Sequence, residues 1–162
     1  MDYRYFSHHY LSIIPKIAKM KLIISGIIQD KKYFKEKAEP FLNNDDIIYV
    51  GNSGPKRRNE LLGGAYALLH PINFDEPFGM SVAESMFCGT PVIAFHRGFM
   101  SELIVDGKTG FLVNSVEEAV ERLSEIKKLD RSYCREWANS NFSQKKMVDD
   151  YLNVYKKILG IR

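Results

Sequence analysis

The sequence of 162 residues lacks the features that mark several large classes of protein. It has only two cysteines, Cys88 and Cys134, which lie far apart and without the spacing of metal ligands. Neither a disulfide framework nor a zinc site is therefore predicted, and this cysteine usage fits a reducing cytoplasm. No apolar run approaches the roughly 20 residues of a membrane-spanning helix, and the aromatic N-terminal segment lacks the apolar centre of a signal peptide.

A dense run of one charge is also missing. The formal net charge is +3, which is mildly basic but gives no Lys/Arg stripe of the kind that binds a nucleic-acid backbone. Nucleic acid is therefore not expected as a partner. The hydrophobic fraction of 45% and the charged fraction of 27% are typical of one globular domain with a real core. No internal repeat, low-complexity tract or linker divides the chain.

Short apolar runs alternate with amphipathic segments along the sequence. The runs are 21–25, 46–50, 66–70, 91–95 and 111–113. Runs of this length between turn residues are typical of strands buried on both faces. They predict an α/β fold in which a mostly parallel sheet has helices on both sides. Because such folds bind ligands at the carboxyl ends of their strands, the loops there are the place to look for a site.

Two helix starts are recognisable in the second half. Ser115 and Glu118 have the spacing of a capping box, which predicts a helix running to about Leu129. Ser143 is predicted to start a last helix, which Gly160 ends. The apolar residues of segment 3–17 also recur at helical spacing, but Pro15 should kink or split a helix there.

One stretch carries the features of a binding site. Glu76 and Glu84 stand eight positions apart, the first in a turn after a predicted strand and the second inside the next predicted helix. A helix N-terminus lies between them, and its free N–H groups and partial positive charge suit a phosphate. Gly79 lets a ligand approach the backbone closely. Since carboxylates accept hydrogen bonds from hydroxyls, the pattern indicates two polyol groups on either side of a diphosphate, as in a nucleotide sugar.

The same stretch resembles the E-x7-E signature of the group 1 (family 4) glycosyltransferases. Segments 83–94 and 102–113 are similar to that family's EAMACGTPVIA and EIVDGxTGFLV segments, and the similarity of order and spacing covers roughly 21–160. The resemblance implies a GT-B architecture, in which two Rossmann-like domains face each other across a cleft. This chain would be the C-terminal, donor-binding domain, a Rossmann-like three-layer αβα unit.

The resemblance also implies a role for each residue of the motif. Glu76 would hydrogen-bond the donor-sugar hydroxyls and is the candidate catalytic residue, while Glu84 would bind the ribose hydroxyls. The residues that would face the donor sugar and phosphates are Glu76, Pro77, Phe78, Gly79, Met80 and Ser81. The nucleobase would lie near Val50, Gly51 and Asn52. Transfer in the family proceeds with retention of configuration and usually needs no metal, so the only small-molecule partner expected is the nucleotide-diphosphate sugar.

Two departures from the family pattern limit the expected activity. Family members open this domain with a strand and a Gly-rich loop whose Arg and Lys clamp the diphosphate, and nothing in the sequence matches them. We expect that strand and the N-terminal acceptor-binding domain to be missing from the chain, which by itself should be inactive or very weak. Membrane association would come only through the absent domain or a lipid acceptor. The second departure is His96-Arg97-Gly98, where the family often has Gly-Gly; Arg97 is predicted to be a surface side chain.

Several candidate residues also have purely structural interpretations. Ser81 and Glu84 have capping-box spacing, and His70 at the end of an apolar run is typical of a core or loop-anchoring histidine. Segment 56–58 is predicted to be a solvated basic face, and Trp137 a core residue of a helix. Glu102 either caps a short helix or contacts the missing domain.

Two other functions remain open from the sequence. The chain could be a non-catalytic module that binds a nucleotide sugar or docks onto another protein. A nucleotide-sugar epimerase shares the two-domain architecture, but the E-x7-E signature favours glycosyl transfer. Neither the sugar nor the acceptor can be named from these residues.

Overall fold

The computed structural model describes residues 19–161, so the expected helical segment 3–17 with Pro15 lies outside the described residues. The elements in chain order are β1 (Leu22–Ile24), α2 (Lys31–Lys37), a 3-10 helix (Glu39–Phe41), β2 (Ile47–Tyr49), α3 (Pro55–Gly64), β3 (Leu68–His70), α4 (Met80–Phe87), β4 (Val92–Phe95), α5 (Met100–Leu103), β5 (Gly110–Val113), α6 (Val116–Leu123), a second 3-10 helix (Ile126–Lys128), α7 (Arg131–Phe142) and α8 (Gln144–Leu159).

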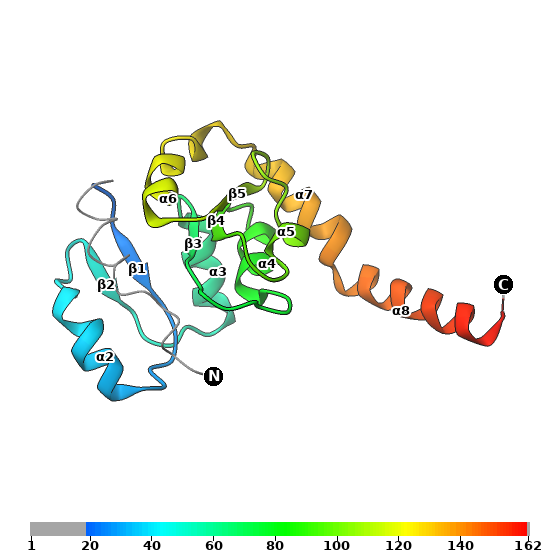
Figure 1. Ribbon diagram of the computed structural model, residues 1–162, viewed down its shortest axis with the longest axis horizontal. Helices are drawn as coiled ribbons and strands as arrows, with labels where there is room; N and C mark the ends of the chain where they lie inside the picture. The colour runs from blue at the N-terminus through cyan, green and yellow to red at the C-terminus, as the bar shows by residue number, and fades with distance from the viewer. Residues whose placement is uncertain (1–18, 162) are drawn as a thin grey trace.

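All five predicted strands are present, and all pair in parallel. In the described residues they form two sheets, one with the order β1-β2 and one with the order β3-β4-β5 (Figure 1). Leu68 lies opposite Val92 in the larger sheet, and Val92 lies opposite Gly110. Gly110 is required there, because a Cβ atom on it would stand 2.1 Å from the Val92 carbonyl oxygen. The predicted parallel α/β fold is confirmed, with its strands divided between two sheets.

Helices cover both faces of the larger sheet, as the buried strand residues predicted. Val92 and Ala94 of β4 pack into a core with helices α4, α5 and α7, while Ile93 points to the opposite core with α6. Successive side chains of a strand point to opposite faces, so β4 contributes to both cores. Trp137 of α7 packs against the first core and donates a hydrogen bond from Nε1 to the Leu103 carbonyl at 2.8 Å, which confirms the prediction for this residue.

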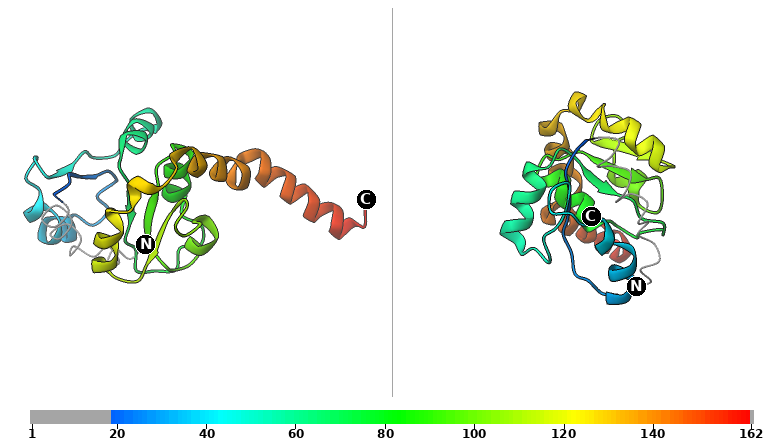
Figure 2. Two further views of the ribbon diagram at one scale, coloured as in Figure 1. Left: turned by 90° about the horizontal axis from the view of Figure 1, so that it is seen from above. Right: turned by 90° about the vertical axis from the view of Figure 1, so that its left-hand side faces the viewer.

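The smaller sheet has its own helix. Phe34 of α2 packs against Tyr49 of β2 with the ring centroids 5.1 Å apart and the ring planes tilted by 55°, and the Tyr49 hydroxyl donates to the Gly26 carbonyl at 2.7 Å. Asp30 caps α2 by accepting a hydrogen bond from the Tyr33 N–H at 2.9 Å. Figures 1 and 2 show β1, β2 and α2 beside the larger sheet, joined to it through α3.

The predicted start of α6 is confirmed, but its predicted end is wrong. The Ser115 hydroxyl accepts a hydrogen bond from the Glu118 N–H at 3.1 Å, and the Glu118 carboxylate accepts one from the Asn114 N–H at 2.8 Å. The helix ends at Leu123 rather than near Leu129. A 3-10 turn follows because the chain tightens there to return Ile126 to the core.

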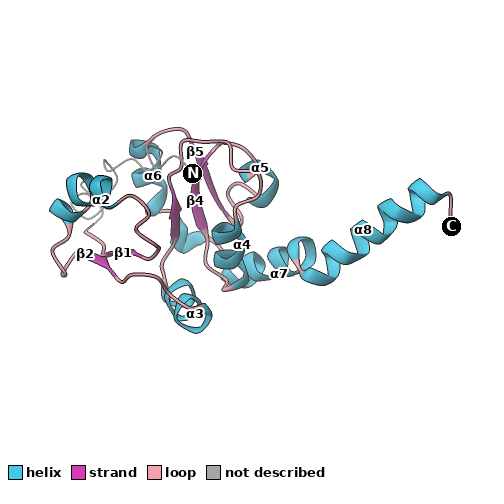
Figure 3. Cartoon of the chain, turned by 90° about the horizontal axis from the view of Figure 1, so that it is seen from below, coloured by secondary structure: helices cyan, strands magenta, loops and turns pink. Residues whose placement is uncertain are grey.

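The last helix begins and ends as predicted. The Ser143 hydroxyl accepts a hydrogen bond from the Lys146 N–H, and Gly160 ends the helix in the left-handed conformation with φ +65°. Helix α8 extends away from the two sheets and buries none of its residues (Figure 3). Its exposed apolar residues are Met147, Val148, Tyr151, Leu152, Val154, Tyr155, Ile158 and Leu159. In residues 19–161, no helix combines the length and apolar character needed to cross a membrane.

Candidate functional site

The β3–α4 loop places the candidate residues at the carboxyl end of β3, where the fold class predicts a site. Helix α4 begins at Met80, directly after Gly79, which adopts φ +96°. A Cβ atom on Gly79 would lie 2.6 Å from Met100 Cε and 3.1 Å from Leu103 Cδ1, so glycine is required by both backbone and packing. Because Gly79 is the N-cap residue, no side chain of that residue caps the first N–H groups of α4, which follow Glu76 closely in the chain.

His70 connects the two sides of this loop. Its Nε2 lies 2.7 Å from Glu76 Oε2, and its Nδ1 lies 3.4 Å from Ser81 Oγ. Since a carboxylate only accepts hydrogen bonds, Nε2 carries the proton and Nδ1 accepts from the serine hydroxyl. Burial lowers the pKa of His70, and the hydrogen bond and charge of Glu76 only partly oppose that effect. The imidazole is therefore neutral near pH 7 and anchors Glu76, as the interpretation of a loop-anchoring histidine predicted.

Glu84 is paired with an arginine. Its Oε1 lies 2.9 Å from Nη2 of Arg58, in the first turns of α3. The capping-box interpretation of Ser81 and Glu84 is wrong, because the cap of α4 is Gly79 and the Ser81 hydroxyl lies at His70. The prediction of a solvated face for segment 56–58 holds only in part for Arg58, whose side chain is 44% exposed but pairs with Glu84. The prediction holds for Arg57, because its side chain and that of its partner Glu60 are both exposed.

The loop after β4 also supports Glu76, which the sequence did not reveal. The Phe99 N–H donates to the Glu76 carbonyl at 3.0 Å, and the Gly98 N–H donates to Asp75 Oδ1 at 3.2 Å. A Cβ atom on Gly98 would stand 2.5 Å from both the backbone N and O of Glu76. The sequence signal for this contact was Gly98, the glycine retained where segment 96–98 departs from the family pattern, because a retained glycine marks a close approach between two backbone segments. Arg97 is exposed, as predicted.

The remaining predicted site residues differ in accessibility. Pro77, Met80 and Ser81 are exposed. The partly buried Phe78 ring packs against the core, where its centroid lies 5.5 Å from that of Phe99. Glu102 is exposed on α5 and does not cap it, since the N-cap residue is Phe99 and its N–H donates to the Glu76 carbonyl; the contact of Glu102 with another domain stays a prediction.

The predicted nucleobase residues follow β2. Gly51 adopts φ +73°, and its carbonyl accepts hydrogen bonds from the Gly26 N–H at 3.0 Å and from the Ser25 hydroxyl at 3.1 Å. Val50 is partly buried and Asn52 is exposed. Segment 50–52 is therefore a loop whose shape is determined by β1, and α3 begins three residues after it.

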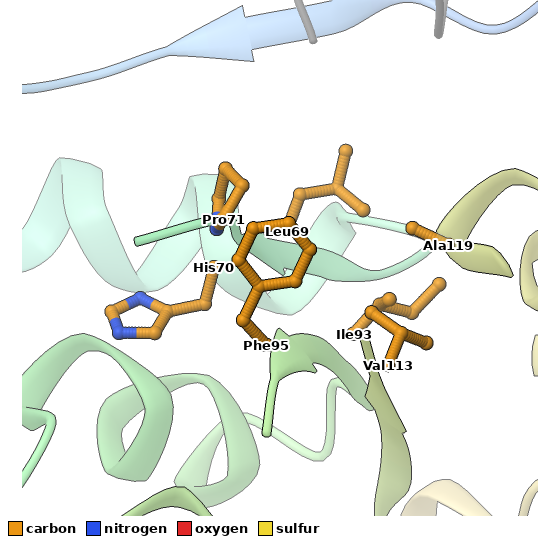
Figure 4. A pocket seen from close by; sticks show the side chains of 7 residues that line it. All are labelled: Leu69, His70, Pro71, Ile93, Phe95, Val113 and Ala119. Carbon is orange, nitrogen blue, oxygen red and sulfur yellow. The ribbon is translucent and has the colours of Figure 1, made fainter. Parts of the chain in front are cut away.

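A small apolar recess lies next to His70. It is lined by Leu69, His70, Pro71, Ile93, Phe95, Val113 and Ala119 (Figure 4). Its volume of about 10 Å³ accommodates roughly one water molecule. In Figure 4 the His70 ring points away from the apolar side chains. The recess is therefore too small for a sugar or a base, and the loop face at Glu76 is the better candidate site.

Other reactive side chains do not gather near this face. In the described part of the chain, no three His, Cys, Asp or Glu side chains lie close enough together to hold a metal ion. Cys88 and Cys134 are both free thiols, and burial raises the pKa of Cys134 to about 11. A thiol with so high a pKa is almost entirely protonated near neutral pH and is a poor nucleophile.

A model of the family described as glycosyl transferases group 1 matches residues 8–144. The chain belongs to this family. A Klebsiella pneumoniae protein of the cps region is 30% identical to it over 158 residues, which cover 92% of this chain and 42% of that protein. A trehalose synthase of Pyrococcus horikoshii is 27% identical over 164 residues, covering 93% of this chain and 40% of the synthase.

Solved structures show the same fold. A Rickettsia africae glycosyltransferase superposes with a TM-score of 0.78 at 22% identity, covering 95% of this chain and 45% of that one. The Anabaena protein HepE in complex with UDP-glucose superposes with a TM-score of 0.75 at 20% identity, covering 92% and 44%. The glycosyltransferase chain therefore has the Rossmann-like fold of one GT-B half, and it spans less than half the length of these relatives.

Proposed function

We propose that this glycosyltransferase domain binds a nucleotide-diphosphate sugar at the β3–α4 loop and supports retaining glycosyl transfer to an acceptor. The observation that carries the proposal is that Glu76, held by His70, precedes the start of α4 and that Glu84, held by Arg58, lies within this helix, whose N-cap Gly79 provides no side-chain cap. One carboxylate would accept hydrogen bonds from the donor sugar and the other from the ribose, with the diphosphate at the helix end between them. The UDP and UDP-glucose complexes of a structural neighbour support this ligand class.

Glu76 is the carboxylate expected to act at the donor sugar, and other groups must stabilise the leaving diphosphate. His70 holds Glu76 at the carboxyl end of β3, where the sugar would lie, and thus fits the interpretation of Glu76 as the catalytic residue. Leaving-group charge would need positive groups beyond the helix dipole, because the family's Arg and Lys clamp has no match in this sequence. We propose that a second, acceptor-binding domain is required for turnover and that no metal takes part.

Calorimetric titrations with UDP and UDP-glucose test the site. Glu84→Gln should weaken both ligands about 10- to 100-fold, because a charged acceptor is lost at the shared ribose. Glu76→Gln should weaken UDP-glucose in the same range but leave UDP unchanged. Glu60→Gln is the matched control, since Glu60 is exposed and pairs with Arg57, and it should change neither affinity. EDTA should also leave both affinities unchanged.

The titrations separate the proposal from its alternatives. If the wild-type chain binds neither UDP nor UDP-glucose, and also fails with the GDP and ADP forms, then the nucleotide-sugar site is wrong. If the carboxylate variants bind like the wild type, the ligand lies elsewhere on the domain. Glycosyl transfer by the chain alone would contradict the requirement for a second domain.

A further inference from the structure

Arg58 is the basic side chain that lies against the proposed ribose-binding carboxylate. Its Nη2 is 2.9 Å from Glu84 Oε1, and the side chains are 44% and 27% exposed, so the pair is accessible from one side. The Nε of Arg58 is buried and, in the described residues, lacks a hydrogen-bond partner. Leaving such a donor unpaired is unfavourable, because its desolvation is not compensated. The ion pair with Glu84 is thus the contact that holds the guanidinium in this position.

Helix α3, which carries Arg58, is itself fixed relative to α4. Arg131 at the start of α7 donates from Nη1 to the Ala65 carbonyl and from Nη2 to the Gly63 carbonyl, both at 2.8 Å. The Thr90 hydroxyl, in the turn after α4, donates to the Leu62 carbonyl at 2.6 Å. These bonds satisfy carbonyls at the end of α3. The Arg58–Glu84 pair therefore joins two helices whose relative position is set elsewhere.

A carboxylate that binds vicinal hydroxyls must present its acceptor oxygens in one defined orientation. Glutamate has three side-chain torsions, and ordering them on ligand binding costs conformational entropy. A charge-assisted hydrogen bond to one oxygen fixes the rotamer in advance and leaves the second oxygen for the ligand. Arg58 donates to Oε1, so Oε2 is the oxygen left to accept from a ribose hydroxyl.

We infer that Arg58 is a positioning residue of the nucleotide site, which holds the Glu84 carboxylate in the orientation that binds the ribose hydroxyls. The inference rests on the proposed function, because it assigns the orientation of a carboxylate whose ligand is proposed above. Arg58 acts through Glu84 and does not itself contact the diphosphate.

A comparison of UDP with 2′,3′-dideoxy-UDP tests the inference by calorimetry. Arg58→Met keeps an unbranched side-chain stem but removes the guanidinium, and it should weaken UDP about 5- to 20-fold, yet leave the dideoxy analogue unchanged. Arg58→Lys restores a donor and should recover part of the loss. In the Glu84→Gln background, Arg58→Met should add little, because a residue that acts through Glu84 loses its effect with it. Arg57→Met is the matched control, since that neighbour pairs with Glu60, and it should bind UDP like the wild type.

Each alternative result has a defined meaning. Equal weakening of UDP and the dideoxy analogue by Arg58→Met, additive with Glu84→Gln, would overturn the inference in favour of direct phosphate contact. Unchanged UDP binding in Arg58→Met would overturn it while leaving the proposed site intact. Wild-type chain that binds no nucleotide would instead contradict the proposed function. Thermal unfolding of each variant distinguishes these results from a loss of folding.

Discussion

At the scale of single residues, His70 shows how a buried imidazole can organise a loop. It is 9% exposed and contacts one residue before the turn and one after it. Burial favours the neutral form, in which Nε2–H donates to Glu76 and Nδ1 accepts from Ser81. Protonation would place a donor on both nitrogens, so that the Ser81 hydroxyl could no longer donate to Nδ1. The loop therefore depends on the charge state of His70.

The lowered pKa of His70 predicts a pH dependence of stability. A group whose pKa is lower in the folded state contributes stability that is complete above its unfolded pKa, near 6.5, and is lost as pH falls through the folded pKa. Urea unfolding from pH 8 to pH 5 should therefore show a smaller acid-induced loss in His70→Gln than in the wild type. His96→Gln is the control, because His96 is exposed. A larger acid-induced loss in His70→Gln would mean that attraction to Glu76 outweighs burial.

At the scale of elements, the β4–α5 loop is as much a part of the site as the β3–α4 loop that contains the motif. Two backbone N–H groups of the first loop, from Gly98 and Phe99, hold Asp75 and Glu76 of the second. Gly98 adopts φ +52° and lies where a side chain would collide with the Glu76 backbone. The position of Glu76 is therefore determined by two elements, His70 at the end of β3 and the β4–α5 loop.

Gly98→Ala and Gly107→Ala form a matched pair that separates the effect of the close contact between Gly98 and the Glu76 backbone from the effect of a positive φ. Both glycines have positive φ, but a Cβ atom on Gly107 would meet nothing within 4 Å. Both substitutions should cost about 1–2 kcal/mol for the backbone conformation. Gly98→Ala should cost about 1–3 kcal/mol more, because the Glu76 backbone must shift, and it should also weaken UDP-glucose. Chemical unfolding and calorimetry measure both effects. Equal behaviour of the two variants would show that the loops are not tightly coupled.

At the scale of the whole molecule, the chain is a folded body with a projecting helix. Most buried hydrophobic residues belong to the two cores around the β3–β5 sheet, whereas α8 contributes none; Figure 1 shows this helix projecting from the rest of the chain. Lys145 and Lys146 form ion pairs with Asp149 and Asp150 on its polar side, and these exposed contacts are worth little. A 16-residue helix without tertiary packing is marginal in water. Helix α8 should thus be the least stable element of the described chain.

Removal of α8 tests this expectation. A chain ending at Ser143 should lose less than about 1 kcal/mol of unfolding free energy, because little apolar surface leaves a buried position. Met86→Ala is the contrasting control, since Met86 is completely buried and its truncation should cost about 2–5 kcal/mol. Urea unfolding measures both. A loss of several kcal/mol on removing α8 would show that the helix packs against another surface in solution.

The sequence by itself determined the local features of this protein. Apolar runs between turn residues predicted the five strands, and the serines before α6 and α8 predicted where those helices begin, because these signals depend on neighbours a few residues apart. The E-x7-E stretch likewise identified the loop and the helix start between the two glutamates. The predicted end of α6 was wrong because it depends on how Ile126 returns to the core, which is not a local signal.

Only the tertiary structure decided which side chains support that stretch. Capping-box spacing assigned Glu84 to its own helix, but packing of α3 against α4 gives it Arg58 as a partner instead. Likewise, Gly98 reaches Glu76 because adjacent parallel strands bring their following loops to one sheet edge. Such contacts join distant parts of the chain, and they depend on how whole elements pack, which no short-range spacing encodes.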